Sequence, residues 1–409
     1  MEINEYWFSL KSHIYVDFKS EKVLLYDTKK GNYKDVISEE AINLISQLYK
    51  AENLGVVKID EKMQLKTGIM TFVDEVVSQQ MGDLMEVKEN MPTPIQLIPI
   101  LNLQKDIDKL KKVNENIELL GENILKYLLE INLYVNNVCN NSCTYCKDYC
   151  KQFNCCTAGS DLQELPIEYV ELIFKQIKYS NVRKINLSGG NILLYSNLNK
   201  IRNIVGFSKN IHIYLHYNLY EKNDFLDIVN LELIVNFPLN KDAFNNAFSL
   251  ANKEQTTFHL IIENEEQYLN AEKLINEFDI TKYSINPFYT GENIDFFKKN
   301  IFLDKDDIFS NTLSMREIFR NKKLNSNYFG TLHILPDGTV KTNMNCKSLG
   351  NIKSKSILDL ILKEMLDNTG WRVVRDQKPC SDCTYQWICP PISNYELAIG
   401  KTSLCHLRK

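Results

Sequence analysis

Long hydrophobic runs, a basic excess and early cysteines are all missing from this sequence. No apolar stretch approaches the roughly 18 residues that a membrane-spanning helix needs. Lysine and arginine number 48 and aspartate and glutamate 52, so the net charge is −4 and predicts neither nucleic acid nor a membrane as partner. The first residues are acidic and no apolar segment follows them, unlike a signal peptide, so we expect a cytoplasmic protein.

The composition is that of a globular protein with unusually placed cysteines. At about 150 residues per domain, the 409 residues predict two to three domains. Of the eleven cysteines, six lie between Cys139 and Cys156 and five between Cys346 and Cys405. In a reducing compartment, clustered cysteines bind metals or do chemistry more often than they form disulfides. The two clusters therefore predict two separate sites.

Residues 1–85 show the pattern of a small winged-helix-like module. Strands are expected at 14–18 and 23–26, on either side of a polar turn, and at 56–59. Apolar residues at helical spacing predict a helix over 41–48, capped by Ser38, and another over 69–77. The segment has no cysteine. From the pattern alone, a purely structural domain is an equally good interpretation.

A linker is expected at residues 86–126. Pro92, Pro94 and Pro99 each remove a backbone donor and disfavour helix at the preceding residue. A polar, lysine-rich stretch follows at 104–116, and such composition is typical of a connecting segment.

From residue 127 to 324, short apolar strands alternate with amphipathic helical patterns. This alternation predicts an α/β fold with a parallel sheet, whose chemistry lies on loops at the carboxyl ends of the strands. The first cysteines follow the first expected strand, and Ser188-Gly-Gly-Asn191 follows the second. The six expected strands are residues 131–135, 184–187, 211–216, 232–237, 257–262 and 283–286.

Residues 325–409 form a third expected part. Asp337-Gly338 between alternating runs at 332–335 and 339–342 predicts a β-hairpin. A helix is expected over 356–366, and a cysteine-rich tail follows it.

The first cluster contains the spacing CxxxCxxC, at Cys139, Cys143 and Cys146. Three thiolates on one loop can hold three irons of a [4Fe–4S] cluster, which leaves the fourth iron open to another ligand. Zinc fits less well, because no histidine lies in the segment to complete the site. A structural metal or coincidental thiols remain alternatives.

This loop resembles that of the radical S-adenosylmethionine (radical SAM) enzymes, and Tyr145 occupies the place of their aromatic residue. The resemblance implies a partial (β/α)6 TIM-like barrel. It also implies a catalytic cluster whose open iron binds S-adenosylmethionine, with cleavage to a 5′-deoxyadenosyl radical that abstracts hydrogen from the substrate. The cofactor supplies the radical, and the protein supplies position and shelter.

The resemblance extends to a second motif. Gly189-Gly190-Asn191 is similar to the family's Gly-Gly-Glu, which binds the methionine amino group, although Asn191 lacks the charge of glutamate. The family's ribose contacts would fall near Asn236 and Asn264. No acid or base is assigned, and Asp148, Tyr149 and His216 are candidates. The other thiols of the loop are structural, face the substrate, or belong to a lid: Cys150, Cys155 and Cys156.

The second cluster is Cys380-x2-Cys383-x5-Cys389-x15-Cys405, a set that suits either zinc or a fully ligated iron–sulfur cluster. It resembles the SPASM domain of peptide-modifying radical SAM enzymes, which implies one auxiliary [4Fe–4S] cluster. A second auxiliary cluster is not expected, because Ser393 and Lys355 stand where cysteines would be needed. Cys346 is then an orphan or an alternative ligand.

Taken together, the motifs resemble a radical SAM maturase of a ribosomally made peptide, in a subgroup associated with double-glycine-leader peptides of Bacteroidetes-type clusters. The resemblance implies that residues 1–85 bind the leader of a precursor peptide. It also implies a small reductant protein of the flavodoxin or ferredoxin type. The product, whether a thioether, a carbon–carbon crosslink or an epimer, stays open. The alternatives are a non-catalytic pseudo-radical-SAM chaperone or scaffold and a zinc-stabilised binding protein.

Overall fold

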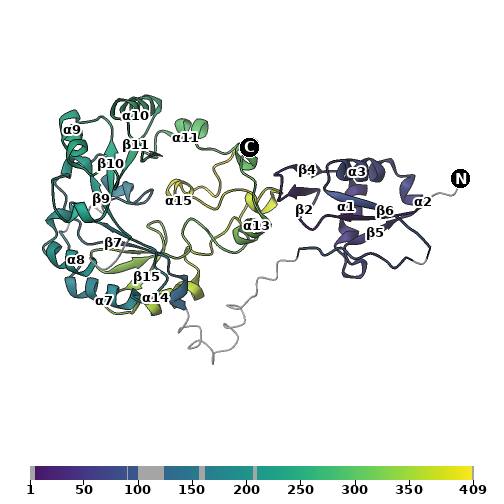
Figure 1. Ribbon diagram of the computed structural model, residues 1–409, viewed down its shortest axis with the longest axis horizontal. Helices are drawn as coiled ribbons and strands as arrows, with labels where there is room; N and C mark the ends of the chain where they lie inside the picture. Colours follow the sequence, from purple (N-terminus) through teal and green to yellow (C-terminus); the bar gives the residue numbers. More distant parts are fainter. Residues whose placement is uncertain (1–4, 90, 100–123, 156–161, 206–209, 408–409) are drawn as a thin grey trace.

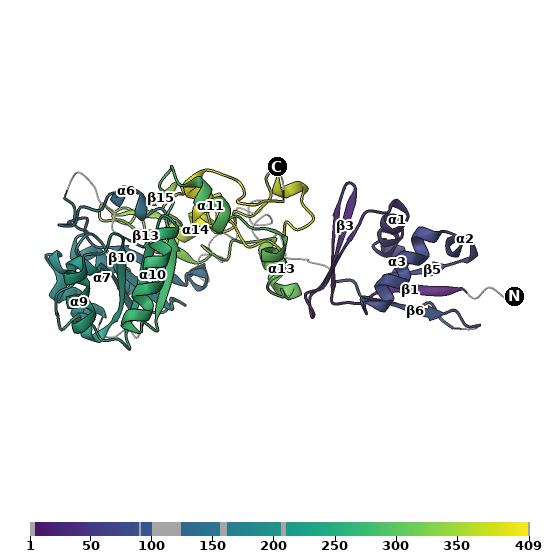
Figure 2. The ribbon, with the colours of Figure 1, turned by 90° about the horizontal axis from the view of Figure 1, so that it is seen from above.

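The computed structural model describes residues 5–89, 91–99, 124–155, 162–205 and 210–407. A large α/β part lies at one end of the molecule and a smaller amino-terminal part at the other (Figure 1). Helix α13 (Met315–Asn321) and the end of the chain marked C lie between them in both views (Figures 1 and 2). In the described ranges, no helix is long and apolar enough to cross a bilayer.

The amino-terminal module holds two antiparallel three-stranded sheets, ordered β5-β1-β6 and β2-β3-β4. The expected strands and both expected helices are confirmed, and the hydroxyl of Ser38 caps the first helix. Strands β1, β4 and β6 were not predicted. The module's strands are β1 (Tyr6–Leu10), β2 (Ile14–Lys19), β3 (Lys22–Asp27), β4 (Tyr33–Val36), β5 (Val56–Ile59) and β6 (Gly82–Glu86), and its helices are α1 (Glu39–Leu48), α2 (Glu61–Gln64) and α3 (Thr67–Ser78). Its relation to winged-helix modules stays a prediction.

The α/β part is built on a sheet with the order β12-β11-β10-β9-β8-β7-β13-β14-β15. Its first six strands pair in parallel, which confirms the predicted fold class and all six expected strands. They are β7 (Glu130–Tyr134), β8 (Lys184–Ser188), β9 (Ile211–His216), β10 (Asn230–Asn236), β11 (Thr256–Ile262) and β12 (Tyr283–Pro287). The helices between them are α6 (Cys146–Tyr149), α7 (Ile167–Ile177), α8 (Leu198–Val205), α9 (Lys241–Leu250) and α10 (Glu265–Phe278).

Burial explains why the two faces of this sheet differ. Successive side chains of a strand point to opposite faces. On β10, Leu231, Leu233 and Val235 join the main hydrophobic core together with residues of α9 such as Phe244. The alternate residues, such as Glu232, face the other way, and we call that side the inner face.

The carboxyl-terminal part shares the main sheet instead of folding apart from it. Strand β13 pairs in parallel with β7 and in antiparallel with β14, so the expected hairpin extends the sheet across the expected boundary at residue 324. The expected helix over 356–366 is confirmed as α14, which Ser356 caps. The remaining elements are β13 (Thr331–Ile334), β14 (Thr339–Lys341), β15 (Ser348–Asn351), α11 (Ile294–Asn300), α12 (Lys305–Phe309), α13 (Met315–Asn321), α14 (Ile357–Asp367) and α15 (Asn394–Ile399).

The amino-terminal module packs on the carboxyl-terminal segment through one face of the β2-β3-β4 sheet. Tyr26 and Leu24 of β3 are buried against Ile318 of α13 and Ile388. Figure 2 shows the hairpin of β3 standing next to these segments. In the linker, the backbone N–H of Gln96 donates to the Leu54 carbonyl at 2.9 Å, so the first linker residues still follow the module. Residues 100–123 lie outside the described ranges.

Candidate metal centres

The first cysteine loop leaves the carboxyl end of β7 and ends where Cys146 begins α6. Asn141 lies among its sulfurs. The backbone N–H of Asn141 donates to Cys139 Sγ at 3.4 Å, and its side-chain amide donates to Cys143 Sγ at 3.2 Å. Such bonds stabilise a thiolate over a thiol, because they favour the charged form. The loop thus presents sulfurs that suit a cationic metal group.

Electrostatics confirms that the thiols of this loop are grouped. Burial, and then the neighbouring thiols of Cys155, Cys146 and Cys139, raise the pKa of Cys143 to about 12. Several thiolates can share so small a volume only when a positive group lies among them. The donor set therefore fits the cluster that the spacing predicts.

The Gly-Gly turn after β8 is explained by the course of the cysteine loop. A Cβ atom on Gly189 would collide with the Asn136 side chain, and one on Gly190 would collide with the Val138 carbonyl. The Asn136 side chain also accepts from Gly190 N–H at 2.9 Å and donates to the Asn191 carbonyl at 3.0 Å. The two glycines thus let two functional loops run side by side.

The third residue of that turn has a local partner. Asn191 is 8% exposed, and its Oδ1 accepts from the Leu193 N–H at 3.0 Å, which caps a short helix at Ile192–Leu194. The side chain therefore stabilises the turn itself.

The two other expected cofactor positions differ from each other. Asn236 ends β10 on the inner face, where its Oδ1 lies 2.8 Å from His216 Nε2. Burial lowers the pKa of His216 to about 4, so this imidazole is neutral at physiological pH. Asn264 instead caps α10, and its side chain accepts from the Gln267 N–H at 2.9 Å. Only Asn236 of this pair lies with the other polar groups of the inner face.

Aromatic residues cover the cysteine loop, and sequence reasoning identified only some of them. The ring of Tyr145 lies 5.3 Å from that of Phe288, and the ring of Tyr149 lies 4.5 Å from it. Cys155 is buried in the same cluster. Gln152 exchanges two hydrogen bonds with the backbone of Tyr289, which fastens the loop to the end of β12. Phe288 gave no sequence signal, because a phenylalanine after a strand is commonplace.

The remaining candidates of this loop have less definite surroundings. Burial raises the pKa of Cys150 to about 12, so it is a protonated thiol at neutral pH. Asp148 forms a surface ion pair with Lys151 at 2.7 Å. Cys156 lies outside the described residues.

The four cysteines of the second cluster lie close together. Cys380, Cys383, Cys389 and Cys405 all line one cavity of about 30 Å³, whose other walls include Leu404. Burial, together with the other three thiols, raises the pKa of Cys389 to about 12, and the nearby Arg375 opposes that rise. Four sulfurs around one hollow with a neighbouring guanidinium fit an anionic iron–sulfur group.

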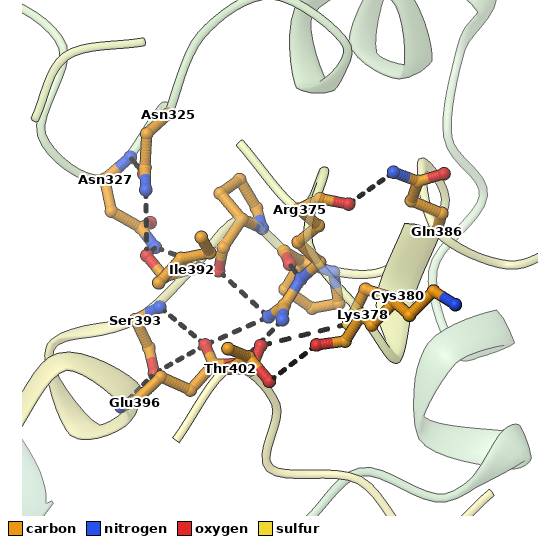
Figure 3. Close-up of polar contacts among 12 residues, drawn as sticks. Asn325, Asn327, Arg375, Lys378, Cys380, Gln386, Ile392, Ser393, Glu396 and Thr402 are labelled. Atoms are coloured by element: carbon orange, nitrogen blue, oxygen red, sulfur yellow. Dashed lines mark hydrogen bonds and ion pairs between the residues drawn. The ribbon is translucent and has the colours of Figure 1, made fainter. Parts of the chain in front are cut away.

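Arg375 is held in place by a buried ion pair. Its guanidinium bonds both carboxylate oxygens of Glu396, at 2.6 and 3.0 Å (Figure 3). Glu396 also accepts from the Ser393 N–H at 2.8 Å, and Ser393 caps α15. Ser393, which replaces an expected cysteine, therefore has a structural role here.

Cys346 does not line the four-cysteine cavity. Its turn instead reaches the first loop, where the Asn345 side chain donates to the Lys151 carbonyl at 2.6 Å. Cys346 was expected to be an orphan or an alternative ligand, and this choice stays a prediction. Among the described residues, no three His, Cys, Asp or Glu side chains are grouped so as to hold a single metal ion.

With this geometry known, comparison identifies the central part of the chain. Residues 133–301 match the family model described as the Radical SAM superfamily. The central part of the chain is therefore similar to the radical SAM superfamily. The match begins inside β7 and ends after α11, so the matched segment includes the cysteine loop, the Gly-Gly turn and strands β8 to β12. No curated protein sequence matches the chain.

Similarity to solved structures extends beyond the segment that matches the radical SAM model. SuiB of Streptococcus suis bound to S-adenosylmethionine is 12% identical over 98% of this chain and 99% of that chain, with a TM-score of 0.50. SuiB bound to the precursor peptide SuiA is 14% identical over 97% and 98%, with a TM-score of 0.47. The His-tagged anSMEcpe with bound AdoMet is 16% identical over 64% and 84%, with a TM-score of 0.44. The first comparison shows a shared fold across the whole chain.

Proposed function

We propose that this protein is a radical SAM enzyme that modifies a ribosomally synthesised peptide. The observation that carries the proposal is the loop of Cys139, Cys143 and Cys146 at the carboxyl end of β7, within the segment that matches the radical SAM model. The four-cysteine cavity and the whole-chain likeness in fold to SuiB add support. The modified bond, whether thioether, carbon–carbon or an epimerised centre, is not chosen by these features.

In this proposal, Cys139, Cys143 and Cys146 hold a [4Fe–4S] cluster, and the turn at Gly189 and Gly190 approaches the S-adenosylmethionine. When bound, these groups supply a 5′-deoxyadenosyl radical that removes a hydrogen atom from the peptide. The protein's own role is to orient the cofactor and the peptide and to shelter the reacting groups from water. The aromatic rings that pack with the loop would help to exclude water from the reacting groups, because they cover part of the loop with apolar surface.

The auxiliary site is proposed to hold one further [4Fe–4S] cluster on Cys380, Cys383, Cys389 and Cys405. A cluster binds each thiolate to its own iron, so it needs a cavity among the sulfurs, and the structure has such a cavity. A positive guanidinium at Arg375 next to the site stabilises the negative charge of a cluster with four thiolates. Electrons are proposed to come from a small flavodoxin- or ferredoxin-type protein.

The leader of the precursor peptide is proposed to bind the amino-terminal module at β4. This strand is an edge of its sheet, because β3 is its single neighbour in the described ranges. A groove of about 280 Å³ follows it, lined by Val36 and Ile37 and by Thr71 and Phe72 of α3. Ile37 is 72% exposed and free to contact a partner. An extended peptide can add to such an edge as a fourth strand and place alternate side chains in the groove.

A non-catalytic chaperone remains the second candidate, and one observation favours it. Asn191 stands at the position of the family's acidic residue, and its side chain already caps the turn. Cofactor binding then depends more heavily on the three cysteines and on backbone groups. A peptide-binding scaffold would keep the β4 groove and need no efficient cofactor site.

Anaerobic reconstitution with iron and sulfide tests the proposed function. We would measure 5′-deoxyadenosine after adding S-adenosylmethionine and dithionite, with and without the peptide encoded beside this gene. The proposal expects product from the wild type, none from Cys143→Ala, and wild-type levels from Cys150→Ala as a matched thiol control. A loaded cluster without any cleavage would favour the chaperone, and a colourless protein with bound zinc would favour the zinc-stabilised binding protein.

A further inference from the structure

The inner face of the sheet carries a chain of hydrogen bonds that the proposed function does not use. The chain runs across four neighbouring strands, β9 to β12. His212 Nδ1 and His259 Nε2 each lie 2.6 Å from a different carboxylate oxygen of Glu232. Ser284 Oγ lies 2.8 Å from the second nitrogen of His259, Nδ1. Two of the protein's six histidines thus share one carboxylate.

This chain lies on the same face as the cysteine loop. By alternation along the strands, His259 shares its face with Ile261, and Glu232 shares its face with Ile234. Ile261 and Ile234 belong to the same hydrophobic cluster as Tyr149 of the cysteine loop. The hydrogen-bond chain therefore lies one side-chain row, about 7 Å, from residues of that cluster.

Oxygen atoms surround both ring nitrogens of His212. The Asn210 amide nitrogen donates to the Arg183 carbonyl, so its Oδ1 is the atom that meets His212 Nε2, at 2.8 Å. His212 is thus held between Asn210 and Glu232, at the far end of the hydrogen-bond chain from Ser284.

His259 lies between a hydroxyl and a carboxylate. Ser284 Oγ accepts from the Asn286 side-chain amide at 2.9 Å and has a hydrogen that it can donate to His259 Nδ1. With that donor, His259 Nε2 is the ring nitrogen that donates to Glu232. An imidazole held by a carboxylate at one nitrogen and by a hydroxyl at the other has the arrangement of a general base.

Accessibility agrees with this role. The His259 side chain keeps 20% of its surface exposed, while the Glu232 side chain keeps 7%. Other titratable groups face His259 from neighbouring strands. The Tyr214 ring lies 5.5 Å from the His259 ring, Lys184 Nζ lies 5.9 Å from the Tyr214 ring, and Glu130 accepts from Asn186 one strand further along.

We propose that Ser284 and His259 form a proton-accepting relay for an X–H group, a thiol, hydroxyl or amide, of the peptide substrate on the inner face. The X–H bond breaks, its proton passes to Ser284 Oγ, and the Ser284 hydrogen passes to His259 Nδ1. The electron pair stays on X, so nothing is oxidised or reduced in this step. Glu232 acts as a positioning residue that stabilises the new imidazolium. The proposal rests on the proposed function for its substrate.

The first test needs no peptide. Diethyl pyrocarbonate reacts with neutral imidazole and not with imidazolium, and mass spectrometry locates each adduct in the reconstituted protein. The relay requires an unprotonated nitrogen at His259, so we expect an adduct at His259 at pH 7. A His259 that stays inert at every pH would overturn the relay.

The second test separates proton transfer from radical formation. His259→Gln and Ser284→Ala should lower peptide modification about 100-fold, while 5′-deoxyadenosine formation stays within twofold of wild type. Ser284→Thr keeps the hydroxyl and should restore most of the modification. His13→Gln, in the amino-terminal module, is the matched control with wild-type behaviour.

The pH profile distinguishes a relay from a merely structural ladder. A relay that accepts a proton works better at higher pH, so wild-type modification should rise with pH, and His259→Gln should lose that rise at an unchanged melting temperature. An unchanged profile in His259→Gln would refute the relay. If the wild type cleaves S-adenosylmethionine but modifies no peptide, the proposed function fails, and the chemical labelling still decides the state of His259.

Discussion

Tyr385 donates its hydroxyl hydrogen to Asp35 Oδ2 across 2.6 Å, and this bond joins the four-cysteine segment to the edge strand of the amino-terminal module. Lys305 Nζ lies 2.8 Å from the same carboxylate oxygen. Burial, and then the hydrogen bond to Asp35, raise the pKa of Tyr385 to about 12, so the phenol remains a donor at neutral pH. Asp35 also lines the β4 groove, so one carboxylate joins the proposed leader site to the segment that carries the four cysteines.

Loss of this shared carboxylate should loosen both segments together. Asp35→Ala removes the acceptor of Tyr385 and of Lys305, whose side chains are partly exposed, so we expect a cost of up to about 1 kcal/mol in docking. Hydrogen–deuterium exchange should rise in residues 33–36 and 380–389 alike. Lys34→Ala is the control, because its partner Glu75 lies within the module. An effect confined to residues 33–36 would argue against the coupling.

The buried ion pair of Arg375 and Glu396 predicts a large loss of stability when it is broken. Arg375→Ala would leave the Glu396 carboxylate, 2% exposed, without its charged partner. We expect the free energy of unfolding to fall by about 3–5 kcal/mol. The amount of iron bound at the auxiliary site should fall as well. Anaerobic urea unfolding and iron analysis would measure both.

A surface pair in the same segment provides the matched control. Lys378 lies 3.7 Å from Asp382, with side chains 83% and 55% exposed. Lys378→Ala should change the free energy of unfolding by less than about 1 kcal/mol. Equal losses in the two variants would mean that the burial of the Arg375 pair has no energetic effect.

Much of the fold followed from sequence because its signals are local. Six apolar strands separated by amphipathic helices predict a parallel sheet, and the Asp337-Gly338 turn predicts its hairpin. The pairing of β13 with β7 was not predictable. Nearly 200 residues separate the two strands, and the sequence of a strand does not indicate which distant strand it pairs with. The expected boundary at residue 324 missed this continuity for the same reason.

The candidate site also has features that the sequence predicts and features that it does not. Cysteine spacing is a local signal, and the structure groups the four late cysteines around one cavity as expected. The role of Asn191 as a cap and the separation of Cys346 depend on which loops lie next to them in space. The hydrogen-bond chain through Glu232 needed four strands in register before its members could be related.

Asn191 offers a test of cofactor affinity. Asn191→Asp keeps an oxygen that can accept from the Leu193 N–H and adds a negative charge near the expected position of the methionine amino group. A charge-assisted hydrogen bond is worth about 1 kcal/mol more than a neutral one. We therefore expect S-adenosylmethionine to bind several-fold more tightly in anaerobic calorimetry.

The control for that variant separates the cap from the charge. Asn191→Ala loses the cap and should cost about 1 kcal/mol of stability. Unchanged affinity in Asn191→Asp, at normal stability, would show that this side chain does not reach the cofactor.

The acid stability of the protein should depend on Glu232. Burial alone would raise the pKa of its carboxyl group, but hydrogen bonds from His212 and His259 outweigh burial and lower the pKa to about 2. A carboxyl whose pKa is depressed on folding stabilises the native state above its unfolded pKa, near 4.5, and this contribution is lost as pH falls toward 2. We expect the contribution to be roughly 1–3 kcal/mol. The free energy of unfolding of the wild type, measured in urea, should therefore fall between pH 5 and about 2. Glu232→Gln should be less stable at pH 7, and its stability should fall less steeply toward acid pH. If the free energy of unfolding fell equally steeply with pH in the two proteins, a strongly depressed pKa at this position would be contradicted.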